Sequence, residues 1–320
     1  MYNTLEFARN IDKNIKESDI TLLQGGFSSQ AYKIDTDDNS YVLLQQRDGA
    51  VSNSKYGHTF VVLKLLESLG YKYSPKPIWV HPEEKAIIIS YFDGVASDKF
   101  DFNKHSVDQK ELSILVIDAV LNTASVPYSD YINLCEKLNF EPHLIQTAVD
   151  NAKRNGTEWF EIIEKHCPDK GIVEWIRPRS AQSVRTANSL PQNEPLLRIT
   201  DPSSPNILIK NNGDFMLIDW DSSSFNTFGP EFYIGYTTHL TDFMEPFKKE
   251  ITEHVARQMN VPFHVLNERV YDHRYYYEVF DISWAAMMMA RVSAGEIKGD
   301  INVFKKIAEE RIANYINEFE

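Results

Sequence analysis

The 320-residue sequence predicts an α+β fold of two lobes, an antiparallel sheet lobe at the N-terminus and a mostly helical lobe after it. Two observations carry this prediction. Short runs with strand character, separated by turn residues, fill most of residues 1–93. Apolar residues then recur at helical spacing through most of residues 94–320. We therefore expect the lobes to meet near residue 93.

The elements of the first lobe follow from its pattern of apolar and turn residues. Residues 1–18 predict a short amphipathic helix, and residues 57–70 predict a longer helix that ends at a glycine. Strands are expected at residues 20–26, 31–37 and 40–47, and two more within residues 76–92 around the turn "HPEE". The segment "GGFSSQ" is expected to form the turn between the first two strands.

The second lobe is predicted to contain helices and one hairpin. Helices are expected at residues 106–124, 141–155 and 157–167, and from residue 230 onward. The runs "PNILIK" and "DFMLIDW" are joined by "NNG", and Asn-Gly supplies the positive φ values of a tight hairpin turn. Residues 177–195 are rich in Pro, Ser, Asn and Gln, so we expect a long functional loop there.

Composition limits the possible partners. The chain has 33 basic and 46 acidic residues, a net charge of −13 and a pI of about 5.2. This balance argues against nucleic acid and membranes and favours a small-molecule partner, with the oligomeric state left open. Its two cysteines are too few for a disulfide framework. No signal peptide or membrane-spanning run is recognisable, so we expect a cytoplasmic protein.

Four polar residues around the hairpin indicate the chemistry. Asp201 lies five residues before Asn206, while Asp219 and Asp221 follow the second strand. Phosphoryl transfer needs mainly positioning and charge neutralisation, and amide and carboxylate oxygens suit Mg²⁺. Asp221 shares a side of the extended chain with Asp219 and could serve a second ion. The alternative is that each of these residues only makes a turn or caps a helix.

The block "ITDPSSPNILIKNNGDFMLIDWD" resembles the catalytic segment of the aminoglycoside phosphotransferase and choline kinase group. The segments "LLQGGFSSQAYKI" and "IIISYFDG" are similar to the nucleotide loop and hinge of the same group. The resemblance covers most of residues 20–94 and 197–235. It implies a protein-kinase-like two-lobed fold, ATP or GTP with Mg²⁺ as cofactors, Asp201 as the base, and Asn206 and Asp219 as metal ligands.

The resemblance also implies contacts with the nucleotide. Backbone N–H groups and hydroxyls of the glycine turn can approach phosphates, which assigns this role to Gly25, Gly26, Ser28 and Ser29. The backbone of Ser90 to Phe92 is expected to pair with adenine. The alternatives are an ordinary hairpin at the glycine turn and an edge strand at residues 90–92.

The sequence departs from the pattern of the group at several positions. Ile199 and Pro202 stand where the group has a histidine and a non-proline residue. The lysine expected on the strand "YVLLQQR" is Gln45, and its glutamate partner on the next helix falls at His58 or Thr59. Some hexosamine 1-kinases of the group carry a similar "YVLQ" strand, so we assign Gln45 to nucleotide binding.

Five arginines could contact anions. Arg47 shares a strand face with Gln45 and could reach a phosphate, although a surface role is the alternative. The others flank the stretch before Asp201 and could hold an anionic acceptor or phosphates, or form ordinary surface ion pairs: Arg177, Arg179, Arg185 and Arg198.

These observations predict an ATP- or GTP- and Mg²⁺-dependent phosphotransferase that phosphorylates a hydroxyl of a small molecule. The acceptor classes are a sugar, an aminosugar, an aminoglycoside or an amino-alcohol, and the Gln45 similarity favours a sugar or aminosugar over choline-like amines. Residues 1–93 would form the nucleotide-binding lobe, and residues 94–320 would carry the catalytic loop and acceptor site. The missing lysine–glutamate pair motivates the alternative of a pseudokinase, which binds nucleotide or a partner without phosphoryl transfer.

Overall fold

A computed structural model describes residues 4–23, 29–46, 56–123, 126–189, 193–199 and 201–319. The chain divides into two compact units. The first unit comprises residues 1–145, 195–225 and 237–251, and the second comprises residues 146–194, 226–236 and 252–320. This division differs from the predicted lobes of residues 1–93 and 94–320, because the segments after residue 93 contribute to both units.

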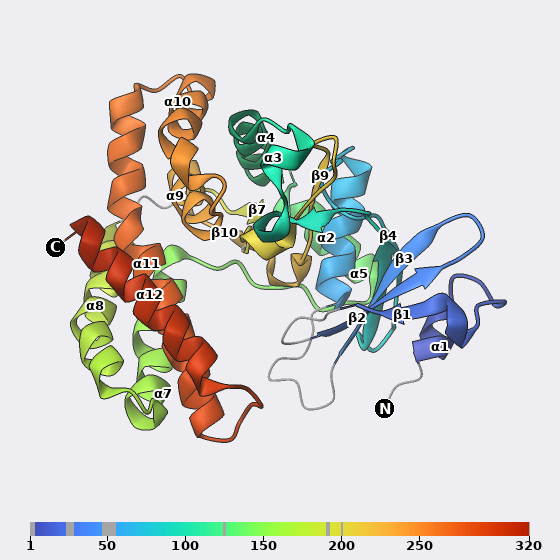
Figure 1. Ribbon diagram of the computed structural model, residues 1–320, viewed down its shortest axis with the longest axis horizontal. Helices are drawn as coiled ribbons and strands as arrows, with labels where there is room; N and C mark the ends of the chain where they lie inside the picture. The colour runs from blue at the N-terminus through green and yellow to red at the C-terminus, as the bar shows by residue number, and fades with distance from the viewer. Residues whose placement is uncertain are drawn as a thin grey trace. The chain divides into compact units, whose positions relative to one another are not determined.

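The first unit contains a five-stranded antiparallel sheet in the order β1-β2-β3-β5-β4 (Figure 1). Helix α2 (Tyr56–Ser68) packs against β4 and β5, and Gly70 follows it with φ +73°. The five predicted strands and the predicted helix of residues 57–70 are therefore confirmed, whereas most of the predicted turn "GGFSSQ" lies outside the described residues. The strands are β1 (Ile20–Leu22), β2 (Ser29–Asp35), β3 (Ser40–Gln46), β4 (Pro77–Val80) and β5 (Ala86–Ser90).

The predicted N-terminal helix is shorter than expected, because α1 spans only Thr4–Ala8. The Asn10 side-chain amide donates to the carbonyls of Glu6 and Phe7 at 3.2 and 3.0 Å. These bonds satisfy carbonyls that a continuing helix would use. The chain beyond α1 instead packs Ile15 with Phe7 and Ala8 into the core against the sheet.

The predicted hairpin is present in a second, three-stranded sheet of order β6-β8-β9. β6 (Val95–Ala96) pairs with β8 (Ile207–Ile209), which pairs with β9 (Phe215–Leu217). The turn closes through Lys210 and Asp214, and Gly213 adopts φ +86°, a conformation that glycine favours. The hairpin thus holds the chain before β8 near the chain after β9.

Further helices and strands complete the first unit. β7 (Leu196–Arg198) pairs with β10 (Ser224–Asn226), where the chain passes into the second unit. The helices are α3 (Phe102–His105), α4 (Gln109–Asn122) and α5 (Tyr128–Leu138). Short 3₁₀ turns lie at Glu17–Asp19, Ser97–Lys99, Ser204–Asn206, Trp220–Ser222 and Glu245–Phe247.

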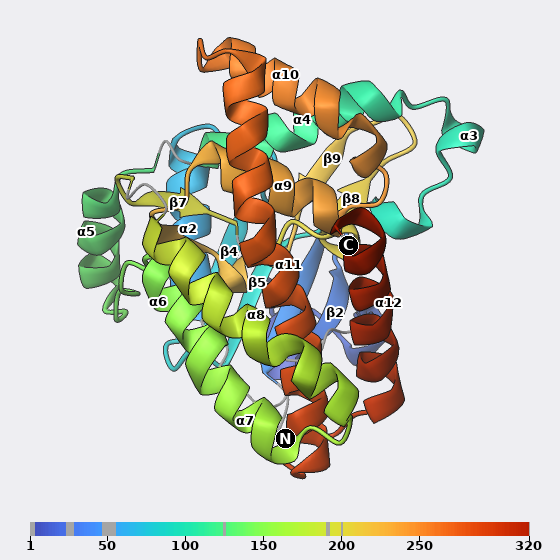
Figure 2. The same ribbon diagram turned by 90° about the vertical axis from the view of Figure 1, so that its left-hand side faces the viewer.

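Helix α11 (Phe263–Ser293) is the centre of the second unit (Figure 2). It packs against α7 (Trp159–His166), α8 (Lys170–Ser189) and α12 (Ile301–Phe319). Its alanine and methionine residues are buried with Ile163 and Ile176 in one core. This segment of the second unit therefore forms core. Two further helices, α9 (Pro230–Leu240) and α10 (Lys248–Gln258), have residues in both units.

The prediction of a loop at residues 177–195 is wrong, because most of this stretch forms the second half of α8. Ile176, Ser180, Ser183 and Ala187 are buried at helical spacing. Small serines replace the large apolar residues of an ordinary buried helix face, so hydropathy alone does not reveal this line of buried residues. Pro178 lies within the helix and does not end it.

The helix predicted at residues 141–155 is confirmed only in part. α6 spans Ala148–Lys153, and a π-helical turn over Arg154–Glu158 continues into α7. Before α6, the His143 N–H donates to the Tyr131 hydroxyl at 2.9 Å, and the His143 carbonyl accepts from the Tyr128 hydroxyl at 3.1 Å. These contacts with α5 hold residue 143 outside a helix.

None of the described helices is long and apolar enough to cross a membrane.

Candidate active site

Asn206 and Asp201 form the centre of the candidate site. The Asn206 side-chain Nδ2 donates to the Asp201 carbonyl at 3.1 Å, to Asp201 Oδ2 at 3.0 Å and to Ser203 Oγ at 3.3 Å. These three acceptors fix which way the amide points, since only Nδ2 can donate. The Asn206 Oδ1 therefore faces away from Asp201, the orientation that the predicted role of an oxygen ligand requires.

The loop that carries Asp201 is attached to its surroundings by buried hydrogen bonds. Ser97 Oγ donates to the Ser204 carbonyl at 2.9 Å, and Thr241 Oγ1 donates to the Pro202 carbonyl at 2.9 Å. The Ile218 N–H donates to the Asn206 carbonyl at 2.9 Å. Because these bonds come from three separate segments, the loop has little freedom to move on its own.

Asp219 has an unusual backbone conformation at the end of the hairpin. Its φ and ψ are +63° and +55°, a left-handed conformation that Asp adopts more readily than most residues. The next residue, Trp220, is buried, and its indole Nε1 donates to the Leu217 carbonyl at 2.8 Å. This anchor holds the sharp turn that brings Asp219 near Asp201 and Asp221.

The three carboxylates repel one another. Desolvation by the surrounding protein atoms, together with the neighbouring carboxylates of Asp221 and Asp201, raises the pKa of Asp219 well above its usual range. Asp219 nevertheless keeps an exposed surface, so solvent reaches the group and a cation could as well. A cation bound here would relieve the repulsion, and this property fits the predicted metal site.

The donor set suits Mg²⁺ in its chemistry. It offers Asn206 Oδ1 and the carboxylates of Asp219 and Asp221, which are hard oxygen ligands. Within the described residues no group of three or more His, Cys, Asp or Glu side chains is arranged to hold a metal by itself. Mg²⁺ commonly completes its octahedron with waters and substrate phosphates, so such a group is not required.

The hinge segment after β5 uses most of its polar groups within the sheet. The Ser90 N–H donates to the Lys76 carbonyl at 2.9 Å, and Ser90 Oγ accepts from the Lys76 N–H at 2.8 Å. The Tyr91 N–H donates to the Ser40 carbonyl at 3.2 Å. The Phe92 N–H has no hydrogen-bond partner among the described residues. Of the predicted hinge positions, Phe92 thus offers the backbone donor for a base.

Gly94 allows the chain to turn closely behind this hinge. A Cβ at Gly94 would lie 2.7 Å from Phe92 Cε1 and 3.2 Å from the Ile209 nitrogen. The absence of a side chain lets the chain pair with β8 directly after the hinge. The hinge and the hairpin are therefore built against each other.

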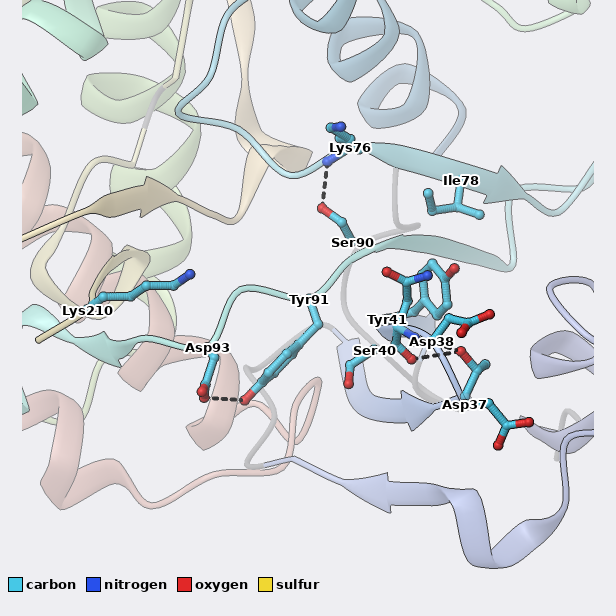
Figure 3. A pocket seen from close by; sticks show the side chains of 12 residues that line it. Asp37, Asp38, Ser40, Tyr41, Lys76, Ile78, Ser90, Tyr91, Asp93 and Lys210 are labelled. Carbon is cyan, nitrogen blue, oxygen red and sulfur yellow. Dashed lines mark hydrogen bonds between the residues drawn. The ribbon is translucent and has the colours of Figure 1, made fainter. Parts of the chain in front are cut away.

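A polar cavity of about 670 Å³ opens beside the hinge (Figure 3). Its walls come from the β2–β3 turn, from Ser90, Tyr91 and Asp93, and from Lys76 and Lys210. Figure 3 shows the Tyr91 and Asp93 side chains pointing toward each other, with their oxygens 3.5 Å apart. Asp201, Asn206 and Asp219 do not line this cavity, so it is distinct from the candidate active site.

The structure argues against Gln45 as a phosphate ligand. Gln45 is buried, accepts from Thr4 Oγ1 at 3.1 Å, and pairs with Ala86 of the core beneath α1. Side chains alternate along a strand, and directly paired residues share a face. Gln46 pairs with Ser29 and therefore lies on the opposite face from Gln45.

The phosphate loop is described only at its last residue. Ser29 Oγ lies 2.7 Å from the Tyr56 hydroxyl at the start of α2, so the two share a hydrogen bond. The predicted ligands Gly25, Gly26 and Ser28 lie outside the described residues, as does Arg47.

The remaining arginines are engaged within the protein. Arg177 pairs with Glu164 at 2.8 Å, and Arg185 donates to Gln182. Arg179 lies over the Trp175 ring at 4.1 Å. Arg198 is buried and donates to the Leu121 carbonyl at 3.2 Å. These contacts favour structural roles over an anion site.

The three other departures from the group have structural explanations. Ile199 is fully buried, so an apolar residue in the core replaces the expected histidine. The Pro202 carbonyl is bonded by Thr241, and the loop needs no donor from the Pro202 nitrogen. His58, at the position expected for a glutamate, is buried against the Ser223 carbonyl. No sequence pattern indicates this contact.

The whole chain has the fold of kinase-like small-molecule phosphotransferases. An ethanolamine kinase from Plasmodium vivax matches with a TM-score of 0.64 and 11% identity, over 95% of this chain and 85% of that one. A choline/ethanolamine kinase family protein from Mesorhizobium loti matches with a TM-score of 0.61 and 14% identity, over 92% and 86%. The predicted two-lobed α+β fold and the resemblance to this group are thereby confirmed at the level of structure.

A thermostable mutant of aminoglycoside phosphotransferase APH(4)-Ia, bound to AMP-PNP and hygromycin B, matches equally well. Its TM-score is 0.61 at 13% identity, over 98% of both chains. No protein-family model and no curated protein sequence matches the chain. At such low identities the likeness shows the fold, and activity has to be argued from the residues.

Proposed function

We propose that the protein is a phosphotransferase that uses ATP or GTP with Mg²⁺ to phosphorylate a hydroxyl group of a small molecule. The observation that carries the proposal is the cluster of Asp201, Asn206, Asp219 and Asp221 on one hairpin. The solved structures with this fold support it, because they include small-molecule kinases with bound AMP-PNP or ADP.

Each side chain has a role that its geometry supports. The Asp201 carboxylate, oriented by Asn206 Nδ2, accepts the proton of the acceptor hydroxyl. The hydroxyl oxygen attacks the γ-phosphorus while the bond from this phosphorus to the β,γ-bridging oxygen breaks, and ADP or GDP leaves. Asn206 Oδ1, Asp219 and Asp221 hold Mg²⁺, which neutralises phosphate charge. The free Phe92 N–H pairs with the base, and the glycine turn before Ser29 covers the phosphates.

The acceptor class is the least constrained part of the proposal. We favour a sugar or aminosugar over an aminoglycoside or an amino-alcohol, on the "YVLQ" similarity alone. The structure shifts attention from Gln45 to Gln46, because Gln46 shares the sheet face of Ser29. We assign Gln46 the phosphate contact that a lysine would make. The acceptor binds to the helical region within residues 94–320, to which the sequence assigns the acceptor site.

A matched pair of variants tests this assignment. Gln46→Leu is expected to weaken nucleotide binding about tenfold, since a hydrogen bond to a charged phosphate contributes roughly 1.5–3 kcal/mol. Gln45→Leu removes the bond to Thr4 on the opposite face of the strand and should leave nucleotide affinity unchanged. Calorimetric titration of both variants with ADP and Mg²⁺ provides the measurement. The reverse order of effects would return the role to Gln45.

The proposal as a whole is tested by thermal denaturation with ATP and with GTP, each with and without Mg²⁺. Ligand binding to the folded state stabilises it by about 2.7 kcal/mol at 100 times the Kd. We expect Mg²⁺ and ATP together to raise the melting temperature more than either alone. A chain that gains no stability from either nucleotide would refute the proposal.

One observation favours a second candidate, a pseudokinase. On α2 the acidic residue is Glu67, and its side chain pairs with Lys64 at 3.1 Å. Neither Gln45 nor Gln46 supplies the positive charge that the group places on this strand. A pseudokinase would gain stability from nucleotide yet transfer no phosphate to any acceptor.

A further inference from the structure

A buried histidine connects helix α2 to the segment that follows the candidate metal ligands. We infer that His58 is a positioning residue, which holds the turn carrying Asp219 and Asp221 in place through the main-chain carbonyl of Ser223. The catalytic meaning of this inference rests on the proposed function, whereas the structural link does not.

Hydrogen-bond geometry determines the state of the imidazole. His58 Nε2 lies 2.7 Å from the Ser223 carbonyl oxygen, which can only accept, so Nε2 carries the proton and donates. In the neutral ring Nδ1 is then an acceptor, and the Tyr131 hydroxyl donates to it at 2.7 Å. The same hydroxyl accepts from the His143 N–H at 2.9 Å. Each donor in this series of hydrogen bonds, from His143 through Tyr131 and His58 to Ser223, therefore meets an acceptor.

The ring of His58 cannot turn away from Ser223 without breaking several contacts. Only 1% of the residue is exposed. The His143 ring stacks on it with centroids 3.8 Å apart and planes within 8°. Tyr131 meets it edge-on at 5.4 Å. The imidazole is thus held by α5 and by the chain that follows α5.

Ser223 transmits this fixed position to the metal ligands. Its N–H and its Oγ both bond the Trp220 carbonyl, at 3.1 and 2.7 Å. Trp220 is in turn bonded to the Leu217 carbonyl of β9. The turn from Asp219 to Ser223 is therefore secured by β9 at one end and by His58 at the other.

The left-handed backbone of Asp219 explains why both ends need an anchor. A non-glycine residue in this conformation is strained and persists only where its surroundings impose it. The repulsion among Asp219, Asp221 and Asp201 also favours opening of the turn. Loss of the His58 link would let the turn relax and separate the metal ligands.

Three substitutions separate positioning from general stability. His58→Leu removes the hydrogen bonds of the imidazole with Ser223 and Tyr131 while keeping an apolar side chain in the buried site. His58→Gln keeps an amide N–H that can donate to the Ser223 carbonyl and a carbonyl that can accept from Tyr131. Ile163→Val, in the core of the second unit, lowers stability modestly without touching this network.

Hydrogen–deuterium exchange of the full chain, below the melting temperature of each variant, measures the link directly. We expect His58→Leu to speed exchange at residues 217–225 by about tenfold, the factor that losing one buried hydrogen bond gives. His58→Gln should stay close to wild type, and Ile163→Val should not change this segment selectively. Unchanged exchange at residues 217–225 in His58→Leu would overturn the inference.

Mn²⁺ binding in the presence of ADP, followed by electron paramagnetic resonance, tests the consequence. His58→Leu should weaken Mn²⁺ binding about tenfold, with rescue by His58→Gln and unchanged affinity for ADP without metal. Equal Mn²⁺ affinity in His58→Leu and wild type would overturn the positioning role. If the wild type binds neither Mn²⁺ nor ADP, the proposed function fails, and the exchange result alone decides the inference.

Discussion

Asp201→Asn is expected to slow phosphoryl transfer by about 10³-fold while leaving nucleotide affinity unchanged, since general-base catalysis contributes typically 10²–10⁴-fold. The asparagine has the same shape, and its side-chain oxygen can still accept from Asn206 Nδ2. What it cannot do is take the proton of the acceptor hydroxyl. Initial-rate kinetics and calorimetric titration with ADP and Mg²⁺ measure the two effects separately.

Asp214→Asn is the matched control for this substitution. Asp214 lies exposed in the turn of the same hairpin, where Asn212 Nδ2 donates to it at 2.9 Å. The exchange of carboxylate for amide there should leave the rate within twofold of wild type, as surface substitutions usually do. Full activity of Asp201→Asn would refute its role as the base.

Asp219→Asn is expected to abolish the stabilisation that Mg²⁺ and nucleotide give together, and to raise the stability of the metal-free protein. Removing one ligand charge eliminates the metal site, whereas it relieves the repulsion with Asp221 and Asp201. Asparagine tolerates the left-handed backbone of this position. Because the site is partly exposed, the repulsion is screened to at most about 1 kcal/mol, or roughly 2–4 °C in melting temperature.

The pH dependence of this gain follows from the sign of the pKa shift. The pKa of Asp219 is raised in the folded protein, because burial and neighbouring carboxylates disfavour its charge. The charged Asp219 therefore lowers the stability of the folded protein at pH above its raised pKa. This loss of stability is absent at pH below the pKa that Asp219 has in the unfolded chain. Thermal denaturation in EDTA should show Asp219→Asn more stable than wild type at pH 8, with the difference lost near pH 4. A variant less stable at both values would contradict the account.

The sequence predicted much of the fold because its signals were local. Alternating strands, the helix that ends before Gly70 and the Asn-Asn-Gly hairpin depend on residues close in the chain, and all are present. The spacing of Asp201, Asn206 and Asp219 likewise predicts their meeting, since a hairpin brings its two ends together.

The failures have physical causes that lie outside local patterns. The half of α8 after Pro178 buries Ser180 and Ser183 in place of large apolar residues, so a hydropathy pattern does not show its buried face. The strand face of Gln45 follows from its pairing with Ala86 on a neighbouring strand, which no local pattern shows. The contact of His58 with Ser223 could not be predicted, because the two residues lie 165 positions apart in the sequence.

The division into compact units could not be predicted from sequence either. Segments 195–225 and 237–251 join the first unit through long-range pairing, such as β6 with β8. A composition change at residue 93 marks where the strands stop and gives no information on which helices pack with them.

Transfer of ³²P from γ-labelled ATP or GTP to a panel of sugars, aminosugars, aminoglycosides and amino-alcohols tests the central claim most directly. With Mg²⁺ present, we expect labelled product from at least one acceptor class, reduced about 10³-fold in Asp201→Asn and unchanged in Asp214→Asn. Nucleotide binding without label on any acceptor, or equal labelling by wild type and Asp201→Asn, would contradict it.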